Sequence, residues 1–149
     1  MKIVIACSTG GHYVQAERLA VIYSQYDYTY LTFKGGVADE LAKTHKVVAI
    51  PNINRKSIIS VLRTFVYSIR AICITRPDVV ISTGAGIVII YCLMAKLSGA
   101  KLVYLESMAR IKSPTITARI LYPFSDLFIV QWENLIVFFP KAKYFGRLL

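Results

Sequence analysis

Short apolar runs alternate with longer stretches of helical periodicity along the whole chain, and this alternation is the feature that most restricts the fold. The first run, Ile3 to Cys7, leads directly into Ser8-Thr9-Gly10-Gly11-His12 and then into a helical pattern. Parallel strands need a crossover connection, which is usually a helix. The pattern therefore predicts an α/β, Rossmann-like domain, with a doubly wound parallel sheet of about six to seven strands and helices on both faces.

The expected elements can be placed by apolar runs, glycines and prolines. The expected strands are 2–8, 28–33, 47–50, 78–82, 101–105, 126–131 and an edge strand at 143–146. The expected helices are 13–25, 37–43, 57–76, 87–97, 116–121 and 132–139. In the first helix the expected core positions are Val14, Leu19, Ile22 and Tyr23, and in the long helix they are Ile58, Leu62, Phe65, Ile69 and Ile72. No low-complexity linker interrupts the chain, so we expect residues 1–149 to form one domain.

Three segments follow strands at the edge of the sheet where ligands bind in open α/β folds. They are 8–12, 83–86 and 106–110, and the first two are glycine turns that lead into helices. Such turns direct backbone N–H groups and the positive end of the helix dipole at a bound anion. A pair of them suits a diphosphate. The alternative is that the glycines serve only to allow tight turns.

Two side chains at this edge are candidates for chemistry. Histidine exchanges a proton near neutral pH, so His12 is a candidate general base or phosphate donor. The alternative is a histidine bonded only to local backbone. Glu106 ends a buried strand, where a carboxylate needs a partner. Arg110 could pair with it in a structural ion pair, or both residues could bind a ligand.

The charge balance indicates an anionic partner. The chain has 149 residues, a net charge of +10, and 18 Lys and Arg against 8 Asp and Glu. No acidic residue lies between Glu40 and Asp78, where the cations are Lys43, Lys46, Arg55, Lys56, Arg63, Arg70 and Arg76. A patch of this kind suits nucleic acid, an anionic membrane surface or a phosphorylated substrate. Signature motifs of nucleic-acid binding, nicotinamide binding and the P-loop are absent. Their absence favours the membrane surface and the phosphorylated substrate.

The long helix at 57–76 has two interpretations. Lys56, Arg63 and Arg70 are spaced by seven, and apolar residues with Tyr67 flank them. A helix whose basic stripe is flanked by apolar residues can bind in a membrane interface. The alternative is a core helix with a solvated cationic face. No membrane-spanning helix is expected, because the longest uncharged apolar run, Ala85 to Ala95, falls short of the ~20 residues that a span needs.

The three cysteines do not indicate a metal site or a disulfide framework. Cys7, Cys73 and Cys92 are scattered, with no metal-ligand spacing, and reduced thiols are expected. No carboxylate cluster suited to a metal is visible either, so no metal is expected.

Four ordered motifs resemble the family of the asparagine-linked-glycosylation subunit. They are Ser8 to His12, Arg76 to Gly86, Tyr104 to Arg110, and Leu121-Tyr122-Pro123 with Asp126 to Trp132. The eukaryotic subunit anchors a second N-acetylglucosamine transferase, and bacterial relatives act in capsule and exopolysaccharide synthesis. The resemblance implies the N-terminal, acceptor-binding half of a GT-B glycosyltransferase. The chain ends after about six strands, so we expect the nucleotide-sugar half on a separate polypeptide.

The resemblance also implies roles for individual residues. His12 becomes the base for the acceptor hydroxyl. The expected acceptor and diphosphate site comprises Ser8, Thr9, Gly10, Gly11, Thr83, Gly84, Gly86, Glu106, Ser107 and Arg110. Glu106 is expected to face the cleft between the two halves. The expected membrane surface comprises Lys56, Arg63, Tyr67 and Arg70. The N-terminal membrane helix of the eukaryotic pattern is missing, so anchoring is expected from 57–76, from the apolar 87–97 region or from the partner.

The sequence therefore predicts one subunit of an inverting glycosyltransferase, inactive or nearly so without its partner. It would present a polyprenyl-diphosphate-linked sugar to a subunit that binds the UDP-sugar, with no cofactor of its own. It is expected to be cytoplasmic and peripheral on the inner face of the cell membrane. One alternative is a non-catalytic subunit that recruits and activates the catalytic one. A less favoured alternative is a stand-alone nucleotide-binding Rossmann domain.

Overall fold

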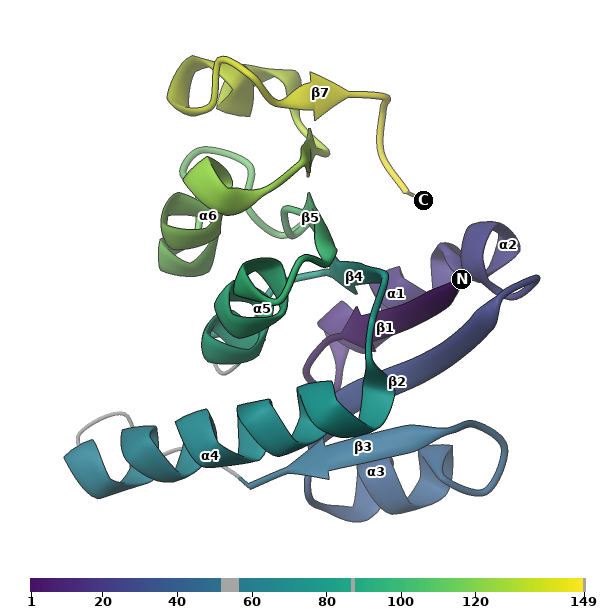
Figure 1. Ribbon diagram of the computed structural model, residues 1–149. Coiled ribbons are helices and arrows are strands. Elements are labelled where there is room, and N and C mark those ends of the chain that lie inside the picture. The colour runs from purple at the N-terminus through teal and green to yellow at the C-terminus, as the bar shows by residue number, and fades with distance from the viewer. Residues whose placement is uncertain (52–56, 87, 149) are drawn as a thin grey trace.

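The computed structural model describes residues 1–51, 57–86 and 88–148. Within these residues seven parallel strands form one sheet, in the order β3-β2-β1-β4-β5-β6-β7 (Figure 1). The strands are β1 Lys2–Ala6, β2 Asp27–Phe33, β3 Val47–Ile50, β4 Val79–Ser82, β5 Lys101–Leu105, β6 Leu127–Val130 and β7 Lys143–Tyr144. The chain moves outward from β1 to β3 and then returns to β4, beside β1. The predicted doubly wound parallel sheet is confirmed.

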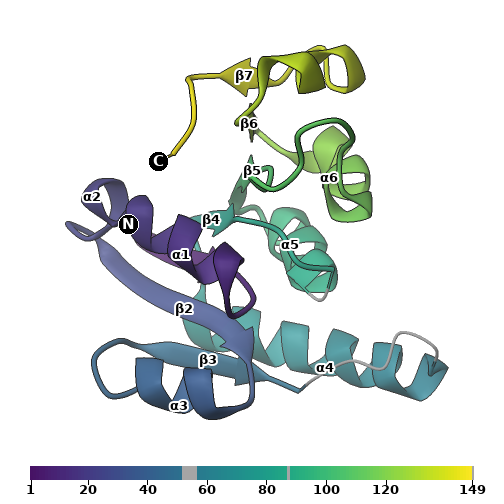
Figure 2. The same ribbon diagram turned by 180° about the vertical axis from the view of Figure 1, so that it is seen from behind.

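Helices cover both faces of the sheet (Figures 1 and 2). One face carries α1 Gly11–Arg18, α2 Ala20–Tyr23 and α3 Gly36–Leu41. The other carries α4 Ile58–Thr75, α5 Val88–Leu97 and α6 Ile116–Leu121. Two short 3₁₀ helices, η1 Tyr122–Phe124 and η2 Glu133–Phe138, follow α6 and β6.

The central strand β1 is buried on both faces, and its alternation divides the core. Val4 and Ala6 belong to the larger cluster, beneath α4, α5 and α6. Ile3 and Ile5 belong to the smaller cluster, beneath α1 and α2. The sequence of a strand that is buried on both faces is a continuous apolar run, because successive side chains point to opposite faces of the sheet. The run that opens the sequence therefore has the composition that a central parallel strand requires.

The first predicted helix is divided in two. Leu19 separates α1 from α2, and its N–H bonds the carbonyl of Ala16, as in a tightened 3₁₀ turn. The hydroxyl of the buried Tyr23 donates to that same carbonyl, at 3.1 Å. The predicted core positions Val14 and Ile22 are wrong, since both are exposed. At the other end of the chain, the predicted helix 132–139 is the 3₁₀ helix η2, and the last strand is shorter than expected.

The inward face of the long helix was also predicted wrongly, except at Ile72, which packs against the main core. Ile58 and Leu62 are 79% and 60% exposed, and Phe65 and Ile69 are exposed too. The buried positions of α4 are small or polar, namely Thr64, Ser68, Ala71 and Thr75, and the partly buried Tyr67 and Ile72 pack against the main core beside them.

Hydrogen bonds within the helix explain why hydroxyl side chains can occupy the packed face of α4. Thr64 and Thr75 donate back to the carbonyls of Ser60 and Ala71, four residues earlier. This bonding satisfies the two threonine hydroxyls without water, whereas the buried Ser68 hydroxyl has no hydrogen-bond partner among the described residues. The small side chains leave the helix a narrow face for close packing. The larger apolar side chains of α4 are left on the outside.

Candidate functional site

A crevice of about 470 Å³ opens beside the first turn of α1. Its lining comes from α1, from the segment after β5 and from the end of the described chain: Gly11, His12, Val14, Gln15, Arg18, Ser107, Met108, Ala109 and Leu148. Of the predicted site residues, Gly11, His12 and Ser107 line this crevice. The fold thus brings two of the three predicted segments to one hollow, at the carboxyl ends of β1 and β5.

Backbone geometry at Gly10 creates the turn into α1. Gly10 has φ +77°, in a region that side chains disfavour, and its carbonyl accepts the N–H of Val14. The helix therefore starts at once after the strand, with its first N–H groups at the rim of the crevice. Ser8 is half-buried beside this turn, and Thr9 is exposed.

His12 is held by the second glycine turn. Its Nδ1 lies 2.6 Å from the carbonyl oxygen of Thr83, and the Thr83 hydroxyl donates to the His12 carbonyl at 2.8 Å. A carbonyl oxygen only accepts hydrogen bonds, so Nδ1 carries the hydrogen in this contact. In the neutral ring Nε2 then keeps its lone pair, and the bond at Nδ1 fixes the orientation of the imidazole. This is the arrangement that a general base requires.

Gly84 lies against the imidazole. An added Cβ would stand 3.0 Å from His12 Cε1 and 3.3 Å from the Tyr104 hydroxyl, and φ is +104°. The N–H of Gly84 donates to the Ser82 hydroxyl at 3.3 Å. The structure therefore places Gly84 beneath His12 as the residue that leaves room for the ring.

The second turn holds a strained residue that the sequence did not indicate. Ala85 has φ +85°, which costs a residue with a Cβ about 1–3 kcal/mol. Such positions gather at functional sites, where the surrounding structure holds them in place. Gly86, the other glycine predicted in this turn, is half-buried.

Glu106 is fully buried, and its carboxylate anchors the loop that follows β5. It accepts the N–H of Ser107 at 2.8 Å, the N–H of Thr115 at 3.1 Å and the Thr115 hydroxyl at 3.0 Å. Burial raises the pKa of this carboxyl, whereas these bonds act in the opposite direction.

The expectations for Glu106 were therefore wrong in two respects. Its carboxylate turns into the protein instead of facing a cleft, and the structure records no ion pair between this residue and Arg110, both of which lie in the described part of the chain. Arg110 is exposed and acts on the carboxylate only as a nearby positive charge.

The residues of the predicted membrane surface are exposed only in part. Arg63 and Arg70 are exposed on α4, as expected. Tyr67 is half-buried and packs on the main core instead of pointing outward. Lys56 lies outside the described residues. The 87–97 region, the other candidate for anchoring, forms α5, which buries Val88, Tyr91, Cys92 and Ala95 in the core.

Helix α4 has the length and apolar composition of a membrane span, which corrects the expectation that no such helix exists. The expectation considered only uncharged runs, whereas α4 contains Arg63 and Arg70 and is otherwise rich in apolar residues. Only 22% of the segment is buried inside the protein. Its small-residue face packs on the core as the crossover between β3 and β4, and larger apolar side chains such as Ile58 and Leu62 are exposed.

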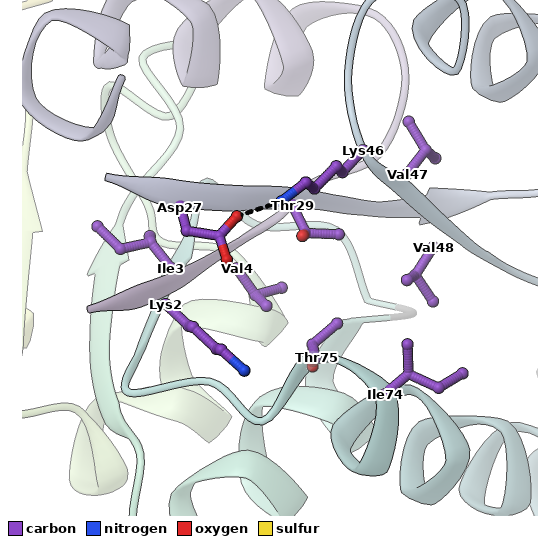
Figure 3. Close-up of a pocket in the computed structure, with 10 residues that line it drawn as sticks. All are labelled: Lys2, Ile3, Val4, Asp27, Thr29, Lys46, Val47, Val48, Ile74 and Thr75. Atoms are coloured by element: carbon purple, nitrogen blue, oxygen red, sulfur yellow. Dashed lines mark hydrogen bonds and ion pairs between the residues drawn. The ribbon is translucent and has the colours of Figure 1, made fainter. Parts of the chain in front are cut away.

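A second cavity, of about 380 Å³, lies at the opposite edge of the sheet (Figure 3). It is formed by the amino ends of β1 and β2, by the start of β3 and by the end of α4. Lys46 forms an ion pair with Asp27 at 2.5 Å. Figure 3 shows this pair together with aliphatic side chains that line the cavity, among them Val4 and Val48. The glycine turns and His12 lie at the other ends of these strands, so this cavity has no part in the candidate site.

Among residues 1–51, 57–86 and 88–148, no group of three or more His, Cys, Asp or Glu side chains could hold a metal ion. Cys7 and Cys92 are buried thiols, and burial raises the pKa of each to about 12. Neither thiol has the thiolate character that metal binding or nucleophilic attack needs.

Four residues near the site were missed by sequence reasoning: Gln15, Tyr104, Thr115 and Gln131. Gln15 and Gln131 bond to residues 93 and 116 positions away in the sequence, whereas Tyr104 in β5 and Thr115 in the segment that follows it bond to each other. The spacing of residues in the sequence does not predict these hydrogen-bonded pairs. The one available signal was a glutamine directly after the apolar run of β6, where a buried polar residue requires a partner.

Comparison with known proteins identifies relatives of the whole arrangement. The family model described as "Oligosaccharide biosynthesis protein Alg14 like" matches residues 39–148. A UDP-N-acetylglucosamine transferase subunit of Kluyveromyces lactis is 36% identical over 68% of this chain and 44% of its own length. The human subunit of the same name is 36% identical over 50% of this chain and 37% of its own. The subunit of Yarrowia lipolytica is 26% identical over 99% of this chain and 81% of its own length. The chain thus spans less than half of the length of the first and second of these relatives.

Solved structures share the fold. MurG of Acinetobacter baumannii superposes with a TM-score of 0.77 at 18% identity, over 99% of this chain and 46% of MurG. A UDP-N-acetylglucosamine 2-epimerase of Rickettsia bellii superposes with a TM-score of 0.76 at 14% identity, over 99% of this chain and 45% of the epimerase. The architecture is therefore the Rossmann-like fold of one half of a GT-B protein.

Proposed function

Because this chain belongs to the Alg14-like family of oligosaccharide biosynthesis proteins, we propose that it is the acceptor-binding subunit of a two-subunit glycosyltransferase. The partner would be a GT-B C-terminal half that binds the UDP-sugar. The relatives are named as UDP-N-acetylglucosamine transferase subunits, which favours UDP-N-acetylglucosamine as the donor. The expected role in capsule or exopolysaccharide synthesis stays a prediction.

The orientation of His12 is the observation that carries the proposal. With its hydrogen on Nδ1, bonded to Thr83, the ring offers Nε2 to a hydroxyl group bound in the crevice. In the proposed step that hydroxyl oxygen attacks the anomeric carbon of the donor sugar while Nε2 takes its proton. The bond from the anomeric carbon to the UDP oxygen breaks, UDP leaves with the electron pair, and the configuration inverts. A positioned base of this kind contributes about 10²–10⁴-fold.

The acceptor is proposed to be a sugar on a polyprenyl diphosphate. The first turn of α1 and the cation Arg18 line the crevice, and the exposed Arg110 directly follows the lining residue Ala109, which supports a diphosphate there. Nucleic acid is not expected as a partner, and no cofactor is assigned to this chain.

Helix α4 supports a membrane location for the acceptor. Figure 1 shows that it extends well past the carboxyl end of β3, toward the edge of the sheet that holds the glycine turns. Its exposed surface combines Ile58, Ile59 and Leu62 with the cations Arg63 and Arg70. Apolar side chains bury in the boundary between headgroups and acyl chains, and arginines attract anionic lipids. We propose that this helix binds the subunit to the cytoplasmic face of the cell membrane.

The test is transfer from UDP-N-acetylglucosamine to a polyprenyl-diphosphate-linked acceptor by the assembled complex. His12→Ala should leave assembly intact and lower turnover by about 100-fold or more, the loss typical of a general base. Near-normal turnover of an assembled His12→Ala complex would overturn the catalytic role and support the alternative, a subunit that only recruits and activates its partner. Tight UDP-sugar binding by the isolated chain would instead favour a stand-alone nucleotide-binding domain.

A further inference from the structure

Two buried glutamines connect all the walls of the crevice. Gln15 stands on α1, one turn after His12, and Gln131 follows β6. They are 6% and 1% exposed, and Gln131 Nε2 donates to Gln15 Oε1 at 2.6 Å. The two residues are 116 positions apart in the sequence, so this bond joins the first and last thirds of the fold.

Each glutamine makes further bonds to a different segment. Gln15 Nε2 donates to the carbonyl of Gly11 at 3.1 Å, and Gln15 Oε1 accepts the N–H of Met108 at 3.0 Å. Gln131 Nε2 donates to the carbonyl of Glu106 at 2.9 Å, and Gln131 Oε1 accepts the N–H of Leu148 at 3.0 Å. The pair therefore joins the His12 turn to the loop after β5 and to the end of the described chain.

Only an amide side chain can fill either position. Gln131 must donate twice and accept once, and Gln15 must donate once and accept twice. A carboxylate has no hydrogen to donate, and an apolar side chain offers neither a donor nor an acceptor. A buried polar network in which both carbonyl oxygens and three of the four amide hydrogens are used is rigid, because breaking one bond leaves a desolvated group without a partner.

We propose that Gln15 and Gln131 are positioning residues that set the distance between the His12 turn and the 106–110 loop, and so the width of the acceptor site. Gly11, Gln15 and Met108 all line the crevice, so a shift of the network moves its walls directly. The pair touches no reacting atom in the proposed reaction. This inference rests on the proposed function for its catalytic consequence, but its structural part is measurable without activity.

Hydrogen exchange tests the structural part on the full chain. Gln131→Met keeps the volume of the side chain and removes its hydrogen bonds. We expect the amide of Leu148, which loses its acceptor, to exchange about tenfold faster or more. The amide of Met108 should also exchange faster, because its acceptor Gln15 Oε1 loses the bond from Gln131 that holds it, with no change at the core strand β1. The matched control is Gln25→Met, since the exposed Gln25 bonds only to the nearby carbonyl of Ile22. Unchanged exchange at Met108 in an intact Gln131→Met fold would overturn the inference.

Two substitutions at Gln15 keep the test decisive if Gln131→Met does not fold. Gln15→Glu retains an acceptor for Met108, and Gln15→Met does not. We expect protection of the Met108 amide to survive in the first variant and to fall about tenfold in the second. Equal protection in the two variants would contradict a positioning role.

Transfer kinetics of the assembled complex test the catalytic consequence. We expect Gln131→Met to raise the KM for the lipid-linked acceptor about tenfold and to leave the KM for the UDP-sugar unchanged. A purely structural role would lower the active fraction, and hence kcat, with no change in either KM. That outcome would overturn the positioning role. If the wild-type complex shows no transfer at all, the proposed function fails, and the exchange data still decide whether the glutamines position the loop.

Discussion

The imidazole Nδ1 of His12 lies 2.6 Å from the carbonyl oxygen of Thr83, and the Thr83 hydroxyl donates a hydrogen bond of 2.8 Å to the His12 carbonyl. The two glycine turns, 71 residues apart in the sequence, are thus joined directly through the candidate base. The first turn supplies the histidine, and the second fixes its tautomer and orientation. A substitution in the second turn should therefore affect catalysis without touching His12.

Thr83→Val should lower transfer by the assembled complex about tenfold. The substitution removes the bond from the Thr83 hydroxyl to the carbonyl of His12, and a bond of this kind contributes about 0.5–1.5 kcal/mol. Thr83→Ser keeps the hydroxyl and is the matched control. Turnover and urea unfolding of both variants check the prediction, and equal turnover in the two would contradict it.

Gly84→Ala should disable the site more severely. Its Cβ would stand 3.0 Å from His12 Cε1, in a backbone conformation with φ +104°. The ring must move away from the carbonyl of Thr83, and the backbone strain adds about 1–2 kcal/mol. We expect a drop in turnover comparable to that of His12→Ala, measured on assembled complex.

Gly99→Ala separates these two effects. Gly99 has φ +98°, and no heavy atom lies within 4 Å of its Cβ position. The variant should therefore lose about 1–2 kcal/mol of stability and retain full transfer per folded molecule. A similar loss of activity in both variants would show that backbone strain, and not displacement of His12, is responsible.

The order of the elements was predictable, because periodicity and glycine turns are local properties of the chain. The continuous apolar run at Ile3 to Cys7 indicated the first strand, and Gly10 indicated the turn into α1. The inward face of α4 was not predictable in this way. Periodicity finds the apolar face of a helix, and here the buried positions are Thr64, Ser68, Ala71 and Thr75.

The candidate site was predictable as an edge of the sheet but not as a set of contacts. Gly11 and His12, which were expected at this edge, line the crevice there. The partner of Glu106 was missed, because Thr115 lies nine residues away and the loop between them has no periodic pattern. The pair of Gln15 and Gln131 depends on tertiary contacts throughout, and only the folded chain brings it together.

Thr115→Val should destabilise the loop after β5 by about 2–3 kcal/mol. The Thr115 hydroxyl donates to the buried carboxylate of Glu106 and accepts the N–H of Ala118 at the start of α6. Loss of the helix cap costs about 1 kcal/mol, and loss of a bond to a buried charge costs a similar amount or more. Thr115→Ser keeps both bonds and should be near wild type in urea unfolding.

The pH dependence of Thr115→Val has a definite sign. Burial already raises the pKa of Glu106, and loss of the Thr115 bond raises it further. Where the folded state keeps a proton that the unfolded chain has lost, stability falls as pH rises above the unfolded pKa of about 4.3. Thr115→Val should thus cost more at pH 7 than at pH 4. An equal cost at both values would contradict an ionised Glu106 in the fold.

Asp126→Asn tests the opposite sign. Asp126 accepts bonds from Lys96 at 2.6 Å, from the N–H of Leu102 at 2.8 Å and from Lys101 at 3.1 Å. The bond from Lys96 is the main cause that holds the pKa of this carboxyl far below its usual range. Its contribution to stability is complete above the unfolded pKa of about 3.9 and is lost as pH falls below it. Asp126→Asn should cost about 1 kcal/mol at pH 7 and progressively less below pH 4 in urea unfolding.

Charge reversal on α4 should release the protein from anionic vesicles. Arg63 and Arg70 are exposed beside Ile59, Leu62 and Val66, so the fold does not depend on their charge. Each cation near an anionic lipid surface contributes about 1 kcal/mol, so loss of two weakens binding about 30-fold, and reversal weakens it further. Arg63→Glu with Arg70→Glu should therefore abolish pelleting with phosphatidylglycerol vesicles.

The control must change net charge equally at another place. Lys141→Glu with Lys143→Glu does so, since both lysines are exposed around the start of β7, away from α4. If α4 is the membrane surface, this control should pellet nearly as well as wild type, because the Debye length of about 8 Å limits the reach of distant charges. Leu62→Ser with Phe65→Ser should also reduce pelleting, since apolar burial in the interface supplies the rest of the affinity. Equal release in both charge variants would attribute binding to net charge and remove α4 from the membrane interface.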